Sequence, residues 1–287
     1  MDILRAIITR RIHERIRGGN RLAAFLTRNM SSVPIEIEGY PPLYVDLRRL
    51  DEHALLLYRS SPFRVPPHEE TLTKLFQQVI LPSDVVFDVG ANLGIHTLTF
   101  SKLARSVVAF EPNPALCPNV NRTLSGLPNA RLLEVCLSEN DGTVEFYISD
   151  WNHHLSSMAN WSTEPSKTIP VSARSLDSLL SEGKLPYPDV LKVDVEGAEM
   201  KVFKGADALF SGPNAPRVVI FEELNTASRK MGISDGEAAN YLSSKGYLLY
   251  LIGEEELSPL PAERPTAANL LAVNSSFVDH IESIDLR

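Results

Sequence analysis

Two groups of side chains in this sequence could take a proton from a hydroxyl group. His153 and His154 are adjacent in a stretch that also carries both tryptophans, and imidazole titrates near neutral pH. Asp194 follows an apolar run of residues, and Glu196 stands just before a glycine. Carboxylates and imidazoles act as general bases when they reach the proton that they accept. These four residues are the candidate catalytic groups, although exposed histidines and a turn-capping aspartate would look the same in sequence.

A glycine-rich turn lies upstream of these groups, over residues 85–96. It combines a run of β-favouring residues, an acid and two glycines in the pattern Asp88-x-Gly90-x-x-x-Gly94, and a helix is expected from Ile95. The spacing differs from the dinucleotide fingerprint G-x-G-x-x-G, because Asn92 occupies a position that needs glycine. It has the form used for S-adenosylmethionine (SAM), whose carboxylate suits a helix N-terminus. An ordinary strand-to-helix turn is the alternative.

Further cofactor contacts are expected at the ends of the next two strands. Glu111 lies 23 residues beyond Asp88, where an acid at the tip of a second strand would accept hydrogen bonds from ribose hydroxyls. Residues 136–138 follow the third strand and are expected to line the adenine pocket. The predicted cofactor-binding residues are Asp88, Gly90, Ala91, Asn92, Gly94, His96, Glu111, Pro112, Ser138 and Asp194.

The same edge of the sheet offers side chains that could hold a metal ion. Asp194 and Glu222 or Glu223 would stand at adjacent strand tips, and oxygen ligands suit Mg²⁺. Clustered acids also arise from turn capping, so we assign no metal ligands.

Composition limits the classes of partner. The chain of 287 residues is 44% apolar and 22% charged, which is typical of globular proteins. The formal net charge is -8, and residues 1–30 contribute +5 through seven arginines, so the remainder carries -13. An acidic body argues against nucleic acid as a partner. Cys117 and Cys136 are the two cysteines, which predicts buried or half-buried reduced thiols and no zinc site.

Residues 3–17 form an amphipathic pattern. Leu4, Ile8, Ile12 and Ile16 share one helical face, and the arginines lie mostly elsewhere. Such a helix could contact an anionic membrane surface or a lipid-linked substrate, cap the domain, or form a homodimer. No apolar run reaches the roughly 20 residues of a membrane-spanning helix. Because Arg10 and Arg11 interrupt the candidate signal segment, we expect a cytoplasmic protein, with peripheral membrane contact as an option.

From residue 85 onward, expected strands and helices alternate, which is typical of a mostly parallel sheet with helices on both faces. Seven strands are predicted, starting at Val85 and at residues 106, 131, 190, 217, 247 and 269, and residues 143–148 form a strand outside this alternation. Helices are expected over residues 95–103, 114–124, 175–180, 198–204 and 235–245, and residues 254–265 as an exposed loop. Upstream, residues 35–47 predict a small hairpin and residues 69–80 a helix. We expect an N-terminal α/β extension over residues 1–80, acting as a lid or interface, and a catalytic domain over residues 81–287.

Several segments together resemble the FkbM family of SAM-dependent methyltransferases. The resemblance covers residues 85–273 and rests on residues 87–94, 109–113, 137–138 with 141–142, 175–177, 192–199 and 269–273. It implies a class I (Rossmann-like) methyltransferase fold, SAM as methyl donor and, commonly, O-methylation of sugars, glycolipids or natural products. His96 stands where relatives often carry tyrosine. Methylation of nitrogen or carboxyl groups on a peptide or polyketide, and a non-catalytic SAM-binding role, remain alternatives.

Overall fold

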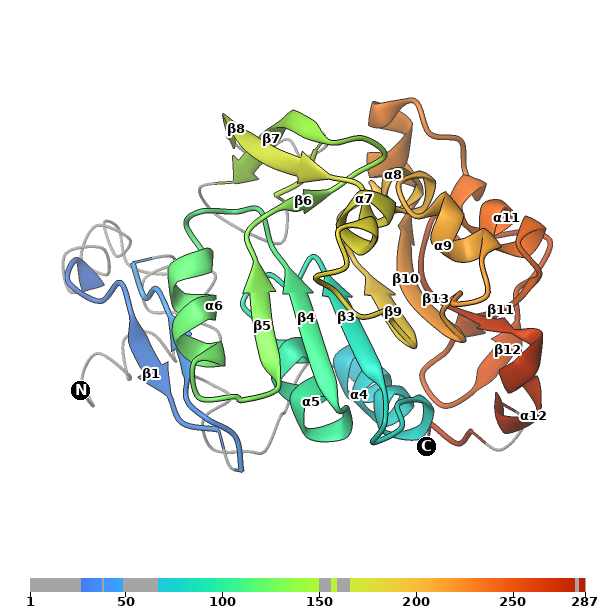
Figure 1. Ribbon diagram of the computed structural model, residues 1–287, viewed down its shortest axis with the longest axis horizontal. Coiled ribbons are helices and arrows are strands. Elements are labelled where there is room, and N and C mark those ends of the chain that lie inside the picture. Colours follow the sequence, from blue (N-terminus) through green and yellow to red (C-terminus); the bar gives the residue numbers. More distant parts are fainter. Residues whose placement is uncertain are drawn as a thin grey trace, which may run out of the picture.

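The computed structural model describes residues 27–37, 39–48, 67–149, 156–158, 166–281 and 284–286. Its centre is an eight-stranded sheet in the order β12-β11-β13-β10-β9-β3-β4-β5 (Figure 1). Five adjacent strands are parallel: β5 (Ala130–Leu133), β4 (Ser106–Phe110), β3 (Val85–Val89), β9 (Val190–Val193) and β10 (Val218–Leu224). Antiparallel pairing then adds β13 (Ala267–Asn274), β11 (Tyr247–Ile252) and β12 (Leu257–Pro259). The predicted α/β class with a mostly parallel sheet is confirmed.

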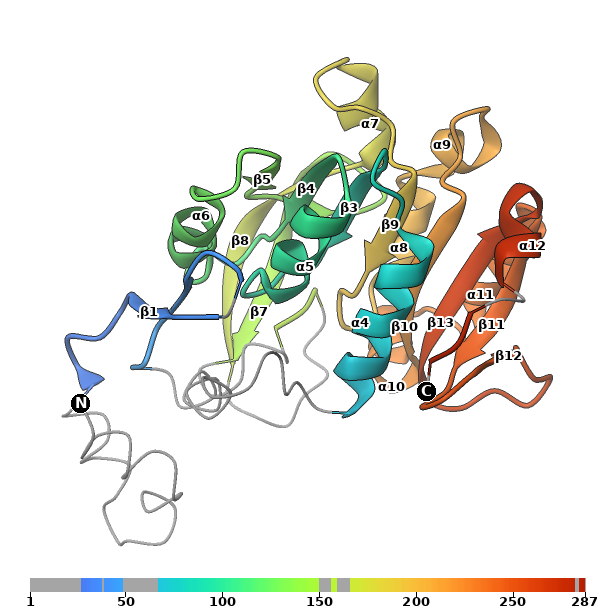
Figure 2. The same cartoon turned by 90° about the horizontal axis from the view of Figure 1, so that it is seen from below.

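Helices cover both faces of the sheet (Figures 1 and 2). Alternation along β3 explains this, because Val85, Phe87 and Val89 enter one hydrophobic cluster and Val86 enters the other. The first cluster lies under α7 (Leu176–Ser181), α8 (Glu199–Lys204), α9 (Asp207–Ser211) and α11 (Glu237–Ser244). The opposite face carries α4 (Pro67–Val79), α5 (Ile95–Leu103), α6 (Cys117–Leu124) and α12 (Val278–Ile281). Two short helices, α10 (Asn225–Ser228) and η3 (Arg229–Met231), follow β10, and η4 (Ser275–Phe277) follows β13.

A second sheet stands beyond the carboxyl ends of β4 and β5 (Figure 1). It has three strands in the order β6-β8-β7, namely β6 (Cys136–Leu137), β8 (Ser166–Arg174) and β7 (Gly142–Ser149). β7 is the strand predicted outside the alternation. The small sheet therefore covers part of the edge at which the parallel strands end.

The predicted N-terminal hairpin is present as β1 (Val33–Ile35) and β2 (Leu43–Val45), which pair antiparallel. It docks on α6, where the Tyr44 amide donates to Thr123 Oγ1 at 3.0 Å and Asn119 Nδ2 donates to the Ser31 carbonyl at 2.9 Å. Helix α4, by contrast, packs with strand residues of the main sheet through Leu75 and Phe76. The predicted boundary after residue 80 stays a prediction, and we propose that the core of the catalytic unit begins at α4.

Three predicted element bounds need correction. Residues 114–116 form a turn, and α6 begins at Cys117 with Pro118 in its first turn, because Asn113 Oδ1 accepts the Ala115 amide. Glu222 and Glu223 lie inside β10 rather than beyond it, because their backbones pair with β13. The predicted loop 254–265 contains β12, whose pairing with β11 adds an eighth strand at the sheet edge.

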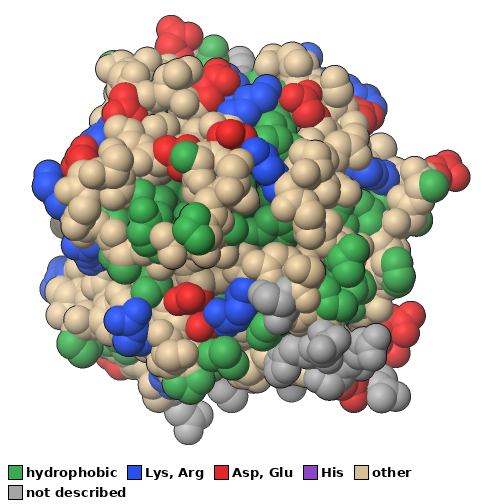
Figure 3. Space-filling view, turned by 45° about the vertical axis from the view of Figure 1, so that its right-hand side comes forward, with side chains coloured by type: hydrophobic (Ala, Val, Ile, Leu, Met, Phe, Trp, Pro, Cys, Tyr) green, Lys and Arg blue, Asp and Glu red, His purple; other side chains and the backbone are tan. Residues whose placement is uncertain are grey.

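Both cysteines are buried and free, as predicted. Burial raises the pKa of the Cys117 and Cys136 thiols to about 12, so they are unreactive at neutral pH. The amphipathic segment 3–17 lies outside the described residues. Within the part of the chain that the structure describes, no helix combines the length and hydrophobicity needed to cross a bilayer. On the face seen in Figure 3, apolar side chains lie between charged ones of both signs, so neither sign dominates that face.

Candidate active site

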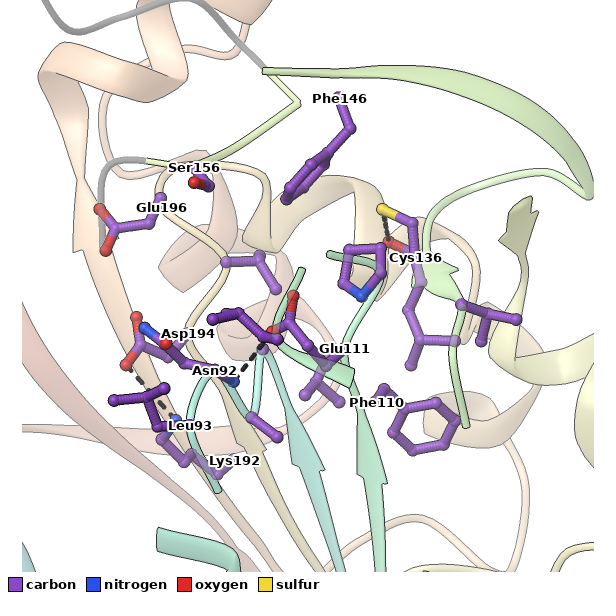
Figure 4. A pocket seen from close by; sticks show the side chains of 18 of the residues that line it. Asn92, Leu93, Phe110, Glu111, Cys136, Phe146, Ser156, Lys192, Asp194 and Glu196 are labelled. Atoms are coloured by element: carbon purple, nitrogen blue, oxygen red, sulfur yellow. Dashed lines mark hydrogen bonds and ion pairs between the residues drawn. The ribbon is translucent and has the colours of Figure 1, made fainter. Parts of the chain in front are cut away.

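A pocket opens at the carboxyl ends of β3, β4 and β9, below the small sheet (Figure 4). One wall is polar and comes from the loop after β3 together with Glu111, Asp194 and Glu196. The other wall is apolar and consists of Val135, Cys136, Leu137, Phe146 and Met158. Ligands bind at this edge of open α/β sheets, and the two walls suit a ligand with a flat apolar part and a polar part.

The loop after β3 is held against its neighbours by backbone hydrogen bonds. The amides of Gly90 and Ala91 both donate to the Phe110 carbonyl at 3.0 Å. Gly90 and Gly94 adopt left-handed backbone angles, with φ of 79° and 81°. A Cβ atom on Gly90 would lie 1.8 Å from the carbonyl oxygen of Asp194. Residue 90 must therefore be glycine, because the chain that follows β9 approaches its backbone closely. A residue without a side chain also leaves the backbone of the loop accessible to a ligand.

Glu111 joins the two loops that border the pocket. Its Oε2 accepts the Asn92 amide and its Oε1 accepts the Asn113 amide, both at 2.8 Å. Burial raises the pKa of this carboxyl to about 7, against the lowering effect of the two backbone hydrogen bonds. Each oxygen keeps a further lone pair, so the side chain can accept a hydrogen bond from a ligand hydroxyl while it orders both loops.

The predicted cofactor-binding residues fall into two groups, those that line the pocket and those that do not. The pocket is lined by Gly90, Ala91, Asn92, His96, Glu111, Pro112 and Asp194. Asp88, Gly94 and Ser138 are not among its lining residues. Gly94 is the N-cap residue of α5, and the amide of Ser138 donates to the Arg174 carbonyl at 3.0 Å. These three residues support the walls rather than face the cavity.

Asp88 is fully buried beneath the glycine loop. Its Oδ2 accepts the Thr97 hydroxyl at 2.6 Å, and its Oδ1 lies 3.3 Å from the ammonium of Lys192. The ammonium is also 3.4 Å from Asp194 Oδ2. Lys192 is not among the site residues predicted from the sequence, although a lysine within the apolar run of residues 190–193 is a signal that could have identified it.

Three carboxylates gather where β9 and β10 end. One oxygen from each of Asp194, Glu196 and Glu222 lies within 4.8 Å of the others. Glu222 and Glu223 alternate on β10, so Glu222 joins this cluster while Glu223 is buried elsewhere. Burial, followed by the charges of Asp194 and Glu222, raises the pKa of Glu196 to about 10. Burial and Asp194 raise the pKa of Glu222 to about 7. Burial and the neighbouring carboxylates thus favour the protonated form of Glu196, which can donate a hydrogen bond.

The turn that carries Glu196 is fixed by side chains around it. Glu196 has φ of 55°, a left-handed angle that is uncommon for residues other than glycine. Glu199 Oε1 accepts the amides of Val195 and Gly197 at 3.2 and 3.1 Å. Ser157 Oγ donates to the Glu196 carbonyl at 2.9 Å, which ties the turn to the segment beside β7. The strained angle is thus held from two sides.

The predicted histidines His153 and His154 lie outside the described residues, and their role stays a prediction. Ser156 and Met158, which follow them closely in the chain, line the pocket.

The acidic cluster has the composition of a divalent-cation site, since carboxylate oxygens are hard ligands. The Lys192 ammonium, 3.4 Å from Asp194, already supplies a positive charge at this position. A metal ion bound to Asp194 would be repelled by it. The side chains present are therefore a poor fit to a metal ion.

Comparison with known proteins decides the family. A model of the methyltransferase FkbM domain matches residues 88–249. The chain belongs to the FkbM methyltransferase family. This membership agrees with the predicted class I methyltransferase fold and with SAM as the cofactor.

Two curated relatives each align with part of this chain. The hexuronic acid methyltransferase AglP of Haloferax volcanii is 35% identical over 142 residues, which are 48% of this chain and 56% of the relative. The 2-O-methyltransferase NoeI of Sinorhizobium fredii is 30% identical over 142 residues, 43% of this chain and 58% of the relative. The chain thus spans somewhat more than half the length of each of these relatives.

Proposed function

We propose that this FkbM family member transfers a methyl group from SAM to a hydroxyl group of a sugar or sugar-containing molecule. The observation that carries the proposal is the position of Asp194, a carboxylate that lines the cofactor-type pocket and is half open to solvent, with a side chain 40% exposed. Two relatives support this acceptor class, because AglP is a hexuronic acid methyltransferase and NoeI is a 2-O-methyltransferase.

The residues of the pocket fit SAM in three places. The N-terminus of α5 lines the pocket through Ile95 and His96, and the positive end of a helix suits a carboxylate. Glu111 at the end of β4 suits ribose hydroxyls, and the apolar wall beside Phe146 suits an adenine ring. Bound there, SAM would supply a sulfonium-activated methyl group.

Asp194 takes the proton from the acceptor hydroxyl in this proposal. A sugar hydroxyl is a weak nucleophile until a base accepts its proton, and a carboxylate within hydrogen-bond reach can do so. Glu196, whose protonated form is favoured by burial and by the neighbouring carboxylates, donates a hydrogen bond to an oxygen of the sugar acceptor and so helps to orient it. His153 and His154 remain the rival base.

Methyl transfer can be tested with tritium-labelled SAM and a panel of acceptors. The panel contains methyl glycosides of glucuronic and galacturonic acid, methyl glycosides of neutral hexoses, and a peptide mixture. We expect label in at least one sugar, with S-adenosylhomocysteine formed in equal amount. SAM binding by calorimetry without transfer to any sugar would contradict the proposal in favour of a non-catalytic protein, and label in the peptides alone would favour N- or carboxyl methylation.

Glu111 makes a testable contribution to the pH dependence of SAM binding. Its pKa of about 7 is raised from the usual value, so the carboxylate that accepts ribose hydroxyls is lost as the pH falls through 7. We expect the Kd for SAM to rise by about 3- to 10-fold from pH 8 to pH 6, measured by calorimetry. Glu111→Gln should bind more weakly but with little pH dependence. A wild-type Kd that stays constant over this range would refute the role given to Glu111.

Removal of divalent cations gives a second test. Because Lys192 already places a cation beside Asp194, we expect the rate of methyl transfer after dialysis against EDTA to stay within about twofold of the untreated rate. Loss of activity that returns on addition of Mg²⁺ would show that the acids bind a metal.

Peripheral membrane contact through residues 3–17 and homodimer formation stay predictions, because these residues lie outside the described ones.

A further inference from the structure

Lys192 is a buried lysine at the centre of the main sheet. It lies on β9 between the apolar residues Leu191 and Val193, and the whole residue is 4% exposed. Lysine is rarely buried in this way, because removal of its ammonium from water is unfavourable unless partners compensate.

The register of the sheet sets the partners of this lysine. Lys192 is opposite Asp88 on β3 and opposite Ile220 on β10. Asp194 follows two residues later, so its side chain emerges on the same face of the sheet as Lys192. Strand pairing therefore places the ammonium between a buried aspartate and the carboxylate at the edge of the pocket.

The contacts form a continuous chain of polar groups. Thr97 on α5 donates to Asp88, Asp88 pairs with Lys192 at 3.3 Å, and Lys192 pairs with Asp194 at 3.4 Å. Figure 4 shows the last of these interactions beside the pocket. Asp88 is fully buried, whereas the Asp194 side chain is 40% exposed, so the inner end of the chain is fixed and the outer end faces the cavity.

Stability alone is a weak reason for this arrangement. A buried ion pair rarely stabilises a fold more than apolar residues of similar size would, because the desolvation of both charges offsets their attraction. A methionine at residue 192 and a leucine at residue 88 could fill the same space. What apolar residues could not do is hold one oxygen of Asp194 in a fixed direction.

We propose that Lys192 is a positioning residue that fixes the Asp194 carboxylate for proton transfer from the acceptor, with Asp88 as its anchor. The inference rests on the proposed function of Asp194 as base. Lys192 binds Oδ2 and leaves Oδ1 of Asp194 for the acceptor hydroxyl. It lies beside Asp194 at the edge of the pocket and acts on the proton transfer through that carboxylate.

The kinetic test uses the double variant Asp88→Asn/Lys192→Met, which removes both inner charges together and leaves no uncompensated buried ion. The acceptor is the sugar that takes up label from SAM in the panel described above. We expect kcat to fall by about 10²-fold, as it does when a catalytic group is misplaced. The KM for the acceptor and the Kd for SAM should each change by less than about threefold. Lys204→Met, at a lysine 47% exposed on α8, is the matched control and should retain full kcat.

Coupling with Asp194 separates positioning from a structural role. Once Asp194→Asn has removed the base, adding the double variant should lower kcat little further, because the residues act as a unit. If the decrease in kcat of the combined variant equals the product of the decreases in Asp194→Asn and in the double variant, the proposal is wrong. If Asp194→Asn itself retains normal kcat, the proposed base is wrong, which is a different failure from normal kcat in the double variant alone.

A crystal structure of the double variant gives a test that needs no acceptor. We expect the Asp194 side chain to turn away or to occupy more than one rotamer, while the backbone of β9 stays in place. An Asp194 carboxylate in its original orientation would overturn the proposal.

Discussion

Replacing Asp194 by asparagine should lower kcat by about 10²- to 10⁴-fold, the range expected when a general base is removed. An amide is nearly the same size as the carboxylate but cannot accept the proton of the acceptor hydroxyl. Because Asn can still accept a hydrogen bond from Lys192, the fold and the Kd for SAM should change little. Methyl transfer from labelled SAM gives kcat, and calorimetry gives the Kd.

Asp235→Asn is a suitable control for this variant. Asp235 pairs with Arg229 on the surface, and it is not among the residues that line the pocket, so its kcat should equal that of the wild type. Normal turnover in Asp194→Asn would show that another group accepts the proton of the acceptor hydroxyl. The variants His153→Ala and His154→Ala would then be measured next.

Replacing Gly90 by alanine should cause a large loss of stability for a single substitution. The new Cβ would lie 1.8 Å from the Asp194 carbonyl oxygen, and alanine at φ of 79° carries a backbone penalty as well. Strain and overpacking together should lower the free energy of unfolding by about 2–6 kcal/mol, measured by denaturation in urea. Any folded fraction should also lose kcat, because Asp194 must move.

Gly232→Ala separates the backbone penalty of a positive φ from the clash of a new Cβ with its neighbours. Gly232 has φ of 73° and open space where a Cβ would stand, so only the backbone penalty of about 1–2 kcal/mol applies. Equal losses in the two variants would show that the contact with Asp194 does not explain the glycine at residue 90.

The central strands were predictable because their sequences leave little choice. Continuous runs such as residues 106–110 are buried on both faces, so their bounds agree with β4. Capping chemistry was equally clear for α7, since the Ser175 side chain accepts the Ser178 amide as a serine at an N-cap does. The edge strand β12 was missed because three residues in a polar, proline-rich stretch carry no periodic signal.

The direction of individual acids was harder to predict. Asp88 has the position of a cofactor-binding acid in its motif, but its partner is set by the pairing of β3 with β9, more than a hundred residues later in the chain. One sequence does not give that register. The same limit hid Lys192 and the separation of Glu222 from Glu223, whereas Glu111 and Asp194 were found because strand ends converge in any parallel sheet.

Identification of the methylated atom tests most directly whether the protein methylates a sugar hydroxyl. The protein is incubated with SAM carrying a ¹³C methyl group and with the sugar that accepts label, and the product is examined by NMR spectroscopy. We expect the methyl resonance of an ether, bonded through oxygen to a single ring carbon of the sugar, and we expect that Asp194→Asn does not produce it. A methyl group on nitrogen or on a carboxylate, or the same yield of ether from Asp194→Asn, would contradict the proposed function.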